Sequence, residues 1–263
     1  MYEFNYHKPA SLDAAASALG AGEDAMLLAG GHTLIPTLKQ RLARPSDLID
    51  LAGIAELAGI SRKGDGIVIG AMTTHGAVAA SAELRSAIPA LAALAEMIGD
   101  PQVRTRGTIG GSVANNDPAA DYPAGLVGLG ATVITNKASH PADDFFTGMF
   151  ETALGDGEII TAVSFPIPER AAYQKFPNPA SRYALVGVFV AVTSGGVRVA
   201  VTGAGPCVFR VREMEAALAG DFSADAIKDI TVDAGGLNSD IHASAEYRAH
   251  LVGVMARRAV AAA

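Results

Sequence analysis

Cysteine is nearly absent from the 263-residue sequence, and tryptophan is missing altogether. The single cysteine, Cys207, excludes a disulfide within the chain, and it cannot hold an iron–sulfur cluster, which usually takes four thiolates. A zinc site of the cysteine-rich kind is excluded for the same reason. We expect Cys207 to be a small buried apolar residue. Any redox chemistry must therefore come from a bound organic cofactor or from another chain.

Long apolar runs and basic clusters are missing too. No apolar run reaches the roughly 18 residues that a membrane-spanning helix needs, and residues 1–6 lack the pattern of a secretory signal. These absences predict a cytoplasmic protein without a transmembrane segment. The formal net charge is −7 and the longest basic cluster is Arg257-Arg258, so the sequence argues against binding to nucleic acid.

Several common nucleotide and hydrolase motifs are absent. The nearest approach to Gly-x-Gly-x-x-Gly is Gly203-Ala204-Gly205, but Val208 occupies its sixth position. The Gly-x-x-x-x-Gly-Lys motif is absent as well, so neither a Rossmann site nor a P-loop is supported. Gly-x-Ser-x-Gly and His-Glu-x-x-His are missing, which argues against a hydrolase elbow and a zincin.

The apolar patterns predict an α+β protein of one large or two moderate domains. Short strands over residues 25–29, 47–51 and 66–71 alternate with helices over 11–19, 34–41, 74–80 and 87–98. Ser11 and Thr33 are the expected helix caps. Residues 99–123 are rich in Gly, Asn, Asp and Pro, and they predict a long, ordered binding loop. Strands follow at 131–135 and 158–165.

Pro166-Ile167-Pro168 marks a boundary, beyond which we expect an antiparallel unit. Two strands, 183–193 and 197–202, are joined by Ser194-Gly195-Gly196, which is typical of a hairpin. Helices over 211–219, 224–229 and 244–260 complete a second α+β domain.

Two double-glycine turns are the strongest chemical signal. Gly30-Gly31 follows a predicted strand and precedes a predicted helix, and Gly110-Gly111 lies in the long loop. Glycine adopts positive φ and has no side chain in the way, so each turn is suited to present backbone N–H groups outward. Either turn alone is commonly an ordinary turn. As a pair, each followed closely by a hydroxyl residue, they suggest a site for the pyrophosphate of a cofactor.

Six segments resemble a known family. Residues 27–36 (Leu-Leu-Ala-Gly-Gly-His-Thr-Leu-Ile-Pro), with 42–45 and 48–51, resemble the opening of the medium subunit of aerobic carbon monoxide dehydrogenase and its relatives. Residues 108–123 (Thr-Ile-Gly-Gly-Ser-Val-Ala-Asn-Asn-Asp-Pro-Ala-Ala-Asp-Tyr-Pro) resemble the second flavin-binding segment of that family, and their length makes the match specific. Residues 4–12 and 202–206 fit as well, so the resemblance spans essentially the whole chain.

This resemblance implies a fold, a cofactor and partners. Residues 1–168 would form a two-lobed FAD-binding domain of the vanillyl-alcohol-oxidase (PCMH) type, with lobes at about 1–55 and 56–168. Residues 169–263 would form a C-terminal α+β domain like that of CO dehydrogenase flavoproteins, with an antiparallel sheet and helices. The implied partners are a small [2Fe-2S] subunit and a large molybdenum-cofactor subunit, assembled as a dimer of heterotrimers. The lone cysteine agrees with this division, because this chain could not hold the clusters itself.

The resemblance also implies which residues bind FAD. Residues 29–33 and 108–112 would wrap its pyrophosphate and ribityl chain, and Asn115 would lie near the phosphates. The full set of implied cofactor-binding residues is Ala29, Gly30, Gly31, His32, Thr33, Leu34, Thr108, Gly110, Gly111, Ser112, Asn115, Asp117, Asp121, Ile160 and Lys175. No catalytic residue and no metal ligand is expected in this chain.

Some of these roles have competing interpretations. Asp121 would accept hydrogen bonds from ribose hydroxyls, or it caps a helix over 122–129. Ile160 would pack on the isoalloxazine ring, but it also suits a strand core. Lys175 would lie near the polar edge of the flavin, where a positive charge favours the anionic reduced form, or it is a solvated surface lysine. His32 lies by the phosphates in the matching segment, which favours hydrogen bonding or packing over covalent attachment of the flavin.

The expected mechanism is an electron relay. A substrate is hydroxylated at molybdenum in the large subunit, electrons cross the iron–sulfur subunit singly, and FAD in this chain passes them to an external acceptor. Two alternatives stay open: a self-sufficient FAD-dependent oxidase or dehydrogenase of the same fold, and a non-redox binding module. The sequence does not identify the organic substrate or the acceptor (NAD, quinone or oxygen). It also does not predict the oligomeric state of the isolated chain or whether the chain retains FAD without partners.

Overall fold

The first lobe is a small parallel sheet with helices at one end of the molecule. The computed structural model describes residues 1–263, and its strands β1 (Asn5–His7), β3 (Asp47–Asp50) and β2 (Ala25–Leu28) pair in parallel in that order. Helices α1 (Leu12–Ala21) and α2 (Leu34–Lys39) and the 3-10 turns η1 (Leu51–Gly53) and η2 (Ala55–Leu57) complete it. Ser11 caps α1 as expected, because its Oγ accepts from the Ala14 N–H at 3.3 Å.

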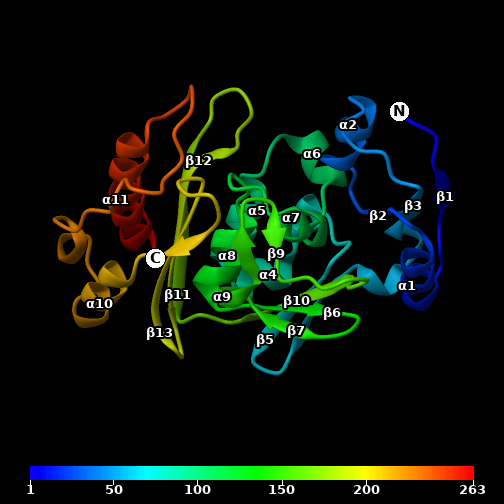
Figure 1. Ribbon diagram of the computed structural model, residues 1–263. Helices are drawn as coiled ribbons and strands as arrows, with labels where there is room; N and C mark the ends of the chain where they lie inside the picture. Colours follow the sequence, from blue (N-terminus) through cyan, green and yellow to red (C-terminus); the bar gives the residue numbers. More distant parts are fainter.

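The second lobe is built on a five-stranded antiparallel sheet. Its order is β4 (Ile60–Lys63), β5 (Gly66–Gly70), β10 (Ile160–Pro166), β6 (Thr132–Thr135) and β7 (Ser139–Pro141). The lobe also contains α3 (His75–Ala80), α4 (Ala82–Ala87), α5 (Pro89–Glu96), α6 (Pro101–Arg106), α7 (Ile109–Asn115), α8 (Tyr122–Leu129), α9 (Ala142–Phe145) and the hairpin β8 (Phe146–Gly148)–β9 (Glu151–Thr152). In Figure 1 this lobe occupies the middle of the molecule, and the first lobe lies beside it near the N-terminus.

The C-terminal part is a four-stranded antiparallel sheet between two helical layers. Strands β11 (Arg170–Pro177), β12 (Ala184–Thr193), β13 (Gly196–Thr202) and β14 (Phe209–Arg210) follow in chain order. Helices α10 (Arg212–Gly220) and α11 (Ala245–Ala262), with η3 (Asp225–Ile227), cover one face, while α8 lies against the other (Figure 1).

Both faces of β12 are buried, which explains its apolar sequence. Val186, Val188 and Val190 face the core made with α10 and α11. Phe189 and Ala191 belong instead to the core of the second lobe. Because side chains alternate along a strand, one strand joins two cores, and the second lobe's core continues across residue 168.

The expected α+β class is confirmed, but three local expectations are wrong. Residues 99–123 are mostly helical, since Asp100 caps α6 through the Val103 N–H and Thr108 caps α7 through the Gly111 N–H. Antiparallel pairing already begins with β4 and β5, well before residue 168. Thr33 occupies the N-cap position of α2, but its side chain makes no capping hydrogen bond.

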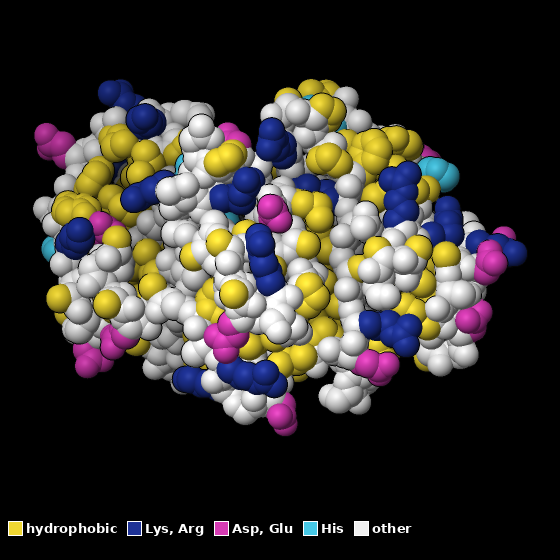
Figure 2. Space-filling view, turned by 180° about the vertical axis from the view of Figure 1, so that it is seen from behind, with side chains coloured by type: hydrophobic (Ala, Val, Ile, Leu, Met, Phe, Trp, Pro, Cys, Tyr) yellow, Lys and Arg dark blue, Asp and Glu magenta, His cyan; other side chains and the backbone are white.

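Two further features concern the outside of the molecule. None of the helices combines the length and the apolar character that crossing a bilayer requires. On the face drawn in Figure 2, Lys and Arg side chains are scattered among uncharged and acidic ones and form no continuous basic area.

Candidate functional site

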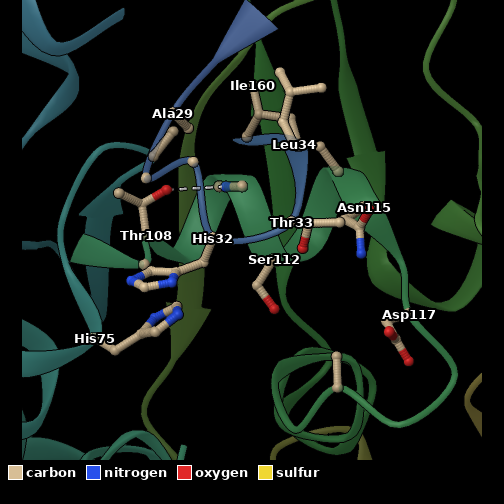
Figure 3. A pocket seen from close by; sticks show the side chains of 18 of the residues that line it. Ala29, His32, Thr33, Leu34, His75, Thr108, Ser112, Asn115, Asp117 and Ile160 are labelled. Carbon is tan, nitrogen blue, oxygen red and sulfur yellow. Dashed lines mark hydrogen bonds between the residues drawn. The ribbon is translucent and has the colours of Figure 1, made fainter. Parts of the chain in front are cut away.

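A cavity of about 560 Å³ lies where the three parts of the chain meet. The first lobe contributes the turn after β2, the second lobe contributes α7 and the ends of β5 and β10, and the C-terminal part contributes residues 181–183. Figure 3 shows labelled side chains from the first and second lobes around the space. Nearly all of the cofactor-binding residues expected from the sequence line it; Lys175 does not.

The turn formed by residues 29–34 leaves its backbone donors unused. No N–H group from Ala29 through Leu34 donates to a protein acceptor, although every one of these residues lines the cavity. Gly31 has φ +76°, a conformation that favours glycine. A Cβ on Gly30 would clash with the Arg106 carbonyl oxygen and would lie 2.8 Å from the Gly107 Cα. The turn is thus pressed against the second lobe, with a run of free donors at the cavity.

The second glycine pair, Gly110-Gly111, does not present free backbone N–H groups as we expected. The N–H of Gly110 donates to the Ala71 carbonyl at 2.8 Å, and the N–H of Gly111 donates to the Thr108 Oγ1 at 3.2 Å. Neither N–H is therefore free for a ligand. The glycines instead permit close approach, since a Cβ on Gly110 would lie 2.8 Å from the Ala71 oxygen and one on Gly111 would lie 3.3 Å from the Ala29 Cβ. This pair shapes the wall of the cavity.

Free side-chain groups supplement the backbone donors. Thr33, Ser112 and Asn115 line the cavity, and none of their side chains makes a hydrogen bond within the protein. In Figure 3 their polar ends lie around the same space. Asp117 also lines it, with one carboxylate oxygen accepting from the Ala119 N–H at 2.8 Å. Ile160 and Leu34 supply apolar wall, so the cavity combines free polar groups with a hydrophobic side.

Asp121 is tied to two residues of the C-terminal sheet. It is buried, it lines the cavity, and its carboxylate accepts from the Tyr173 hydroxyl at 2.5 Å and from the Lys175 Nζ at 3.0 Å. Its side chain does not cap α8, so the capping interpretation is wrong. Burial raises the pKa of Asp121, and the Lys175 charge and the Tyr173 hydrogen bond oppose that rise.

Lys175 is enclosed by the protein. Its side chain is 3% exposed, and Nζ also donates to the Met97 carbonyl at 2.9 Å. The interpretation as a solvated surface lysine is wrong. Lys175 instead links β11 to Asp121 and to the end of α5, which leads to Ile98 and Gly99 in the cavity wall.

Arg104 and Arg106 precede the second glycine pair and have separate environments. The Arg104 guanidinium donates to the carbonyls of Ile98 and Gly99, both at 3.0 Å, so it stabilises the wall of the cavity. Arg106 is exposed on the outside of α6. Neither residue lines the cavity.

His75 is a cavity residue that sequence reasoning missed. It follows the Thr74 cap of α3 and is 5% exposed; Nδ1 is buried without a hydrogen-bond partner. Burial, with smaller contributions from the neighbouring His32 and Arg104, lowers the pKa of His75 to about 4. Its ring lies 5.3 Å from the ring of Tyr122, whose pKa is raised by burial. A lone histidine has no spacing pattern, so only the fold reveals it.

This histidine makes an acid-dependent contribution to stability. The pKa of His75 is 6.5 in an exposed environment and about 4 in the folded chain, so between these values the unfolded chain binds the extra proton. The contribution is present above pH 6.5 and is lost as the pH falls toward 4. At pH 5 the loss is about 2 kcal/mol. His75→Gln cannot titrate, so its free energy of unfolding, measured in urea at pH 7.5 and pH 5, should fall less than that of the wild type by this amount. An equal fall in the free energy of unfolding of the two proteins between pH 7.5 and pH 5 would contradict the lowered pKa of His75.

Comparison with known protein families covers nearly the whole chain. Residues 2–168 match the FAD binding domain in molybdopterin dehydrogenase, and residues 171–263 match the CO dehydrogenase flavoprotein C-terminal domain. The carbon monoxide dehydrogenase medium chain of Afipia carboxidovorans is 38% identical, over 98% of this chain and 95% of its own length. The nicotine 6-hydroxylase medium subunit of Paenarthrobacter nicotinovorans is 35% identical, over 97% and 95%.

Solved structures agree with these sequence matches. Cu,Mo-CO dehydrogenase in its cyanide-inactivated form contains a chain that is 36% identical, with a TM-score of 0.89 over 99% of this chain and 98% of that one. Quinoline 2-oxidoreductase from Pseudomonas putida 86 contains one that is 30% identical, with a TM-score of 0.90 over 99% and 96%. The protein is thus an FAD-containing oxidoreductase subunit by class. It belongs to the family of FAD-binding medium subunits of molybdenum hydroxylases.

Proposed function

We propose that this chain takes electrons from a [2Fe-2S] subunit and passes them through FAD to an external acceptor. The observation that carries the proposal is the run of free N–H donors at residues 29–34, beside the free hydroxyl and amide groups of Thr33, Ser112 and Asn115. Residues 29–34 are partly or fully exposed at the cavity, so their array of unused donors is accessible and fits a ligand rich in acceptor oxygens. The pyrophosphate and ribityl chain of FAD provide such oxygens.

The assignment of residues follows from their places in the cavity. Residues 29–34 would bind the pyrophosphate through the backbone, with His32 and Thr33 at its sides. Ser112, Asn115 and Asp117 would bind oxygens of the ribityl chain or ribose, and Ile160 and Leu34 would pack against apolar parts of the cofactor. Thr108, Gly110 and Gly111 would shape the wall rather than donate, because their groups are already engaged. Asp121 would sit at the edge with its carboxylate held by Lys175.

Bound FAD accepts electrons one at a time or in pairs, which is the redox chemistry that the chain's own side chains cannot supply. The protein would hold it in place with the residues that line the cavity. Within the proposal, the substrate is hydroxylated by a large molybdenum-cofactor subunit, the complex is a dimer of heterotrimers in the cytoplasm, and the chain divides into domains at residue 168. The single cysteine supports separate iron–sulfur and FAD chains.

Purification of the complex tests the relay. An affinity tag on this chain, expressed in the organism that encodes it, should recover two further chains that carry iron, acid-labile sulfide and molybdenum. The complete complex should oxidise an organic substrate, and this chain supplied with FAD should oxidise none. Recovery of the chain alone with full substrate turnover would instead establish a self-sufficient oxidase, and recovery without any FAD would establish a binding module.

A further inference from the structure

His75 lines the cavity, and only one of its two ring nitrogens, Nδ1, is sealed without a partner. It stands at the start of α3, beside the turn that carries Gly30 and Gly31, and it lines the same cavity. Figure 3 shows its ring next to the ring of His32, and the nearby His32 contributes to the lowered pKa of His75. The side chain of His75 is therefore part of the cavity wall at the first glycine turn.

The two nitrogens of His75 have different surroundings. Nδ1 is sealed inside the protein with no hydrogen-bond partner, whereas Nε2 is not among the sealed atoms and makes no hydrogen bond within the protein. Gly107 faces Nε2, and a Cβ there would lie 2.6 Å from that nitrogen. The absence of a side chain at Gly107 leaves room for the edge of the ring that carries Nε2.

These surroundings select one protonation state. A proton on Nδ1 would be a buried donor without an acceptor, which is costly. Arg104, His32 and the burial of the ring disfavour a second proton. The neutral ring therefore carries its proton on Nε2, and it presents an N–H donor to the cavity without a charge.

We propose that His75 binds the diphosphate of FAD, with Nε2–H donating a hydrogen bond to a phosphate oxygen. This inference rests on the proposed function. The free backbone donors of residues 29–34 line the same part of the cavity as His75, and the protein itself offers them no acceptor. A cluster of donors without acceptors is complementary to an oxyanion. His75 extends that cluster from the first lobe into the second, so the phosphates would be held between the lobes.

Ligands that differ in their phosphates provide the test. The complex is freed of flavin, and dissociation constants for FAD, ADP and riboflavin are measured by calorimetry or by flavin fluorescence. His75→Phe keeps an aromatic ring but has no hydrogen-bond donor. It should weaken the binding of FAD and of ADP by about 10–100-fold, as expected for loss of a hydrogen bond to a charged group. Riboflavin has no phosphate, so its binding should change by less than about twofold.

Two variants serve as controls. His75→Gln offers an N–H at a similar reach and should retain FAD binding within about threefold of the wild type. Tyr122 lies next to His75, and Tyr122→Phe removes a buried hydroxyl that has no hydrogen-bond partner. The dissociation constants of all three ligands should therefore stay unchanged.

The outcomes distinguish failure of the proposed FAD-binding function from failure of the role proposed for His75. A wild-type complex that binds none of the ligands would overturn the proposed function itself. A wild-type complex that binds FAD, with His75→Phe equally tight, would overturn only the role of His75. Equal losses for riboflavin and FAD, or equal losses in His75→Gln and His75→Phe, would show that His75 merely supports the fold and would likewise overturn its role.

Discussion

Replacing Gly30 with alanine is expected to weaken FAD binding by roughly 10–100-fold, as follows from an overpacking cost of about 1–3 kcal/mol. The new Cβ would overlap the Arg106 carbonyl oxygen and the Gly107 Cα, which are backbone atoms that cannot rotate away. The turn would have to move off the second lobe. Its free N–H groups would then no longer lie at the cavity, while the rest of the fold would be little affected because the turn is at the surface of the first lobe.

A glycine series makes this prediction specific. Gly31→Ala should also be harmful, since φ is +76° and the Cβ would lie 2.6 Å from the Ile35 Cδ1. Gly111→Ala should be milder, because its nearest contact is the Thr108 Oγ1 at 3.0 Å. Gly20→Ala is the matched control, as nothing lies within 4 Å of its Cβ and it sits in α1. The measurement is FAD bound per chain in the purified complex, followed by titration of the flavin-free complex. Equal FAD binding by Gly30→Ala and Gly20→Ala would contradict the role of this turn.

Replacing Lys175 with methionine is expected to destabilise the fold by about 3–5 kcal/mol, the usual cost of leaving one charge of a buried pair uncompensated. Asp121 and Lys175 are 4% and 3% exposed, and their charged groups lie 3.0 Å apart. Without Lys175, the Asp121 carboxylate would retain the Tyr173 hydroxyl but lose its counter-charge, and the Met97 carbonyl would lose its donor. The midpoint of urea denaturation should fall accordingly.

A double-mutant cycle separates the charge from the packing. Asp121→Asn removes the charge and keeps an acceptor for Tyr173, so the pair Asp121→Asn with Lys175→Met should be more stable than Lys175→Met alone. Lys63→Met, on an exposed strand position, should change the free energy of unfolding by less than about 0.5 kcal/mol. If Lys175→Met were as harmless as Lys63→Met, the buried ion pair would not contribute as described.

The parts of the fold that the sequence predicts are those with a strong local signal. The apolar run of β12 and the hairpin after it appear in the structure close to their expected limits. The cap Ser11 is likewise confirmed, because a hydroxyl that accepts from a nearby N–H depends only on neighbouring residues. The start of a helix at Thr74 is confirmed too. The residues of the first glycine turn line the cavity, since their chemistry also comes from local backbone conformation.

The parts that the sequence does not predict depend on distant residues. Short helices such as α6 and α7 gain little from propensity, and their packing on other elements decides their structure. The N–H of Gly110 could not be assigned before its acceptor was known, because Ala71 lies on a separate segment. The burial of Lys175 depends on Asp121 and Met97, which come from the other side of residue 168. His75 becomes part of the site only when α3 is placed beside the first glycine turn.

The most direct measurement is the absorption spectrum of the complex purified through this chain, recorded without oxygen before and after its organic substrate is added. The account predicts a flavin band that is present at one FAD per copy of this chain, bleaches with substrate, and is reduced in Gly30→Ala relative to the iron–sulfur absorption. A complex that turns over fully with no flavin band, or whose flavin is unchanged in Gly30→Ala, would contradict the account.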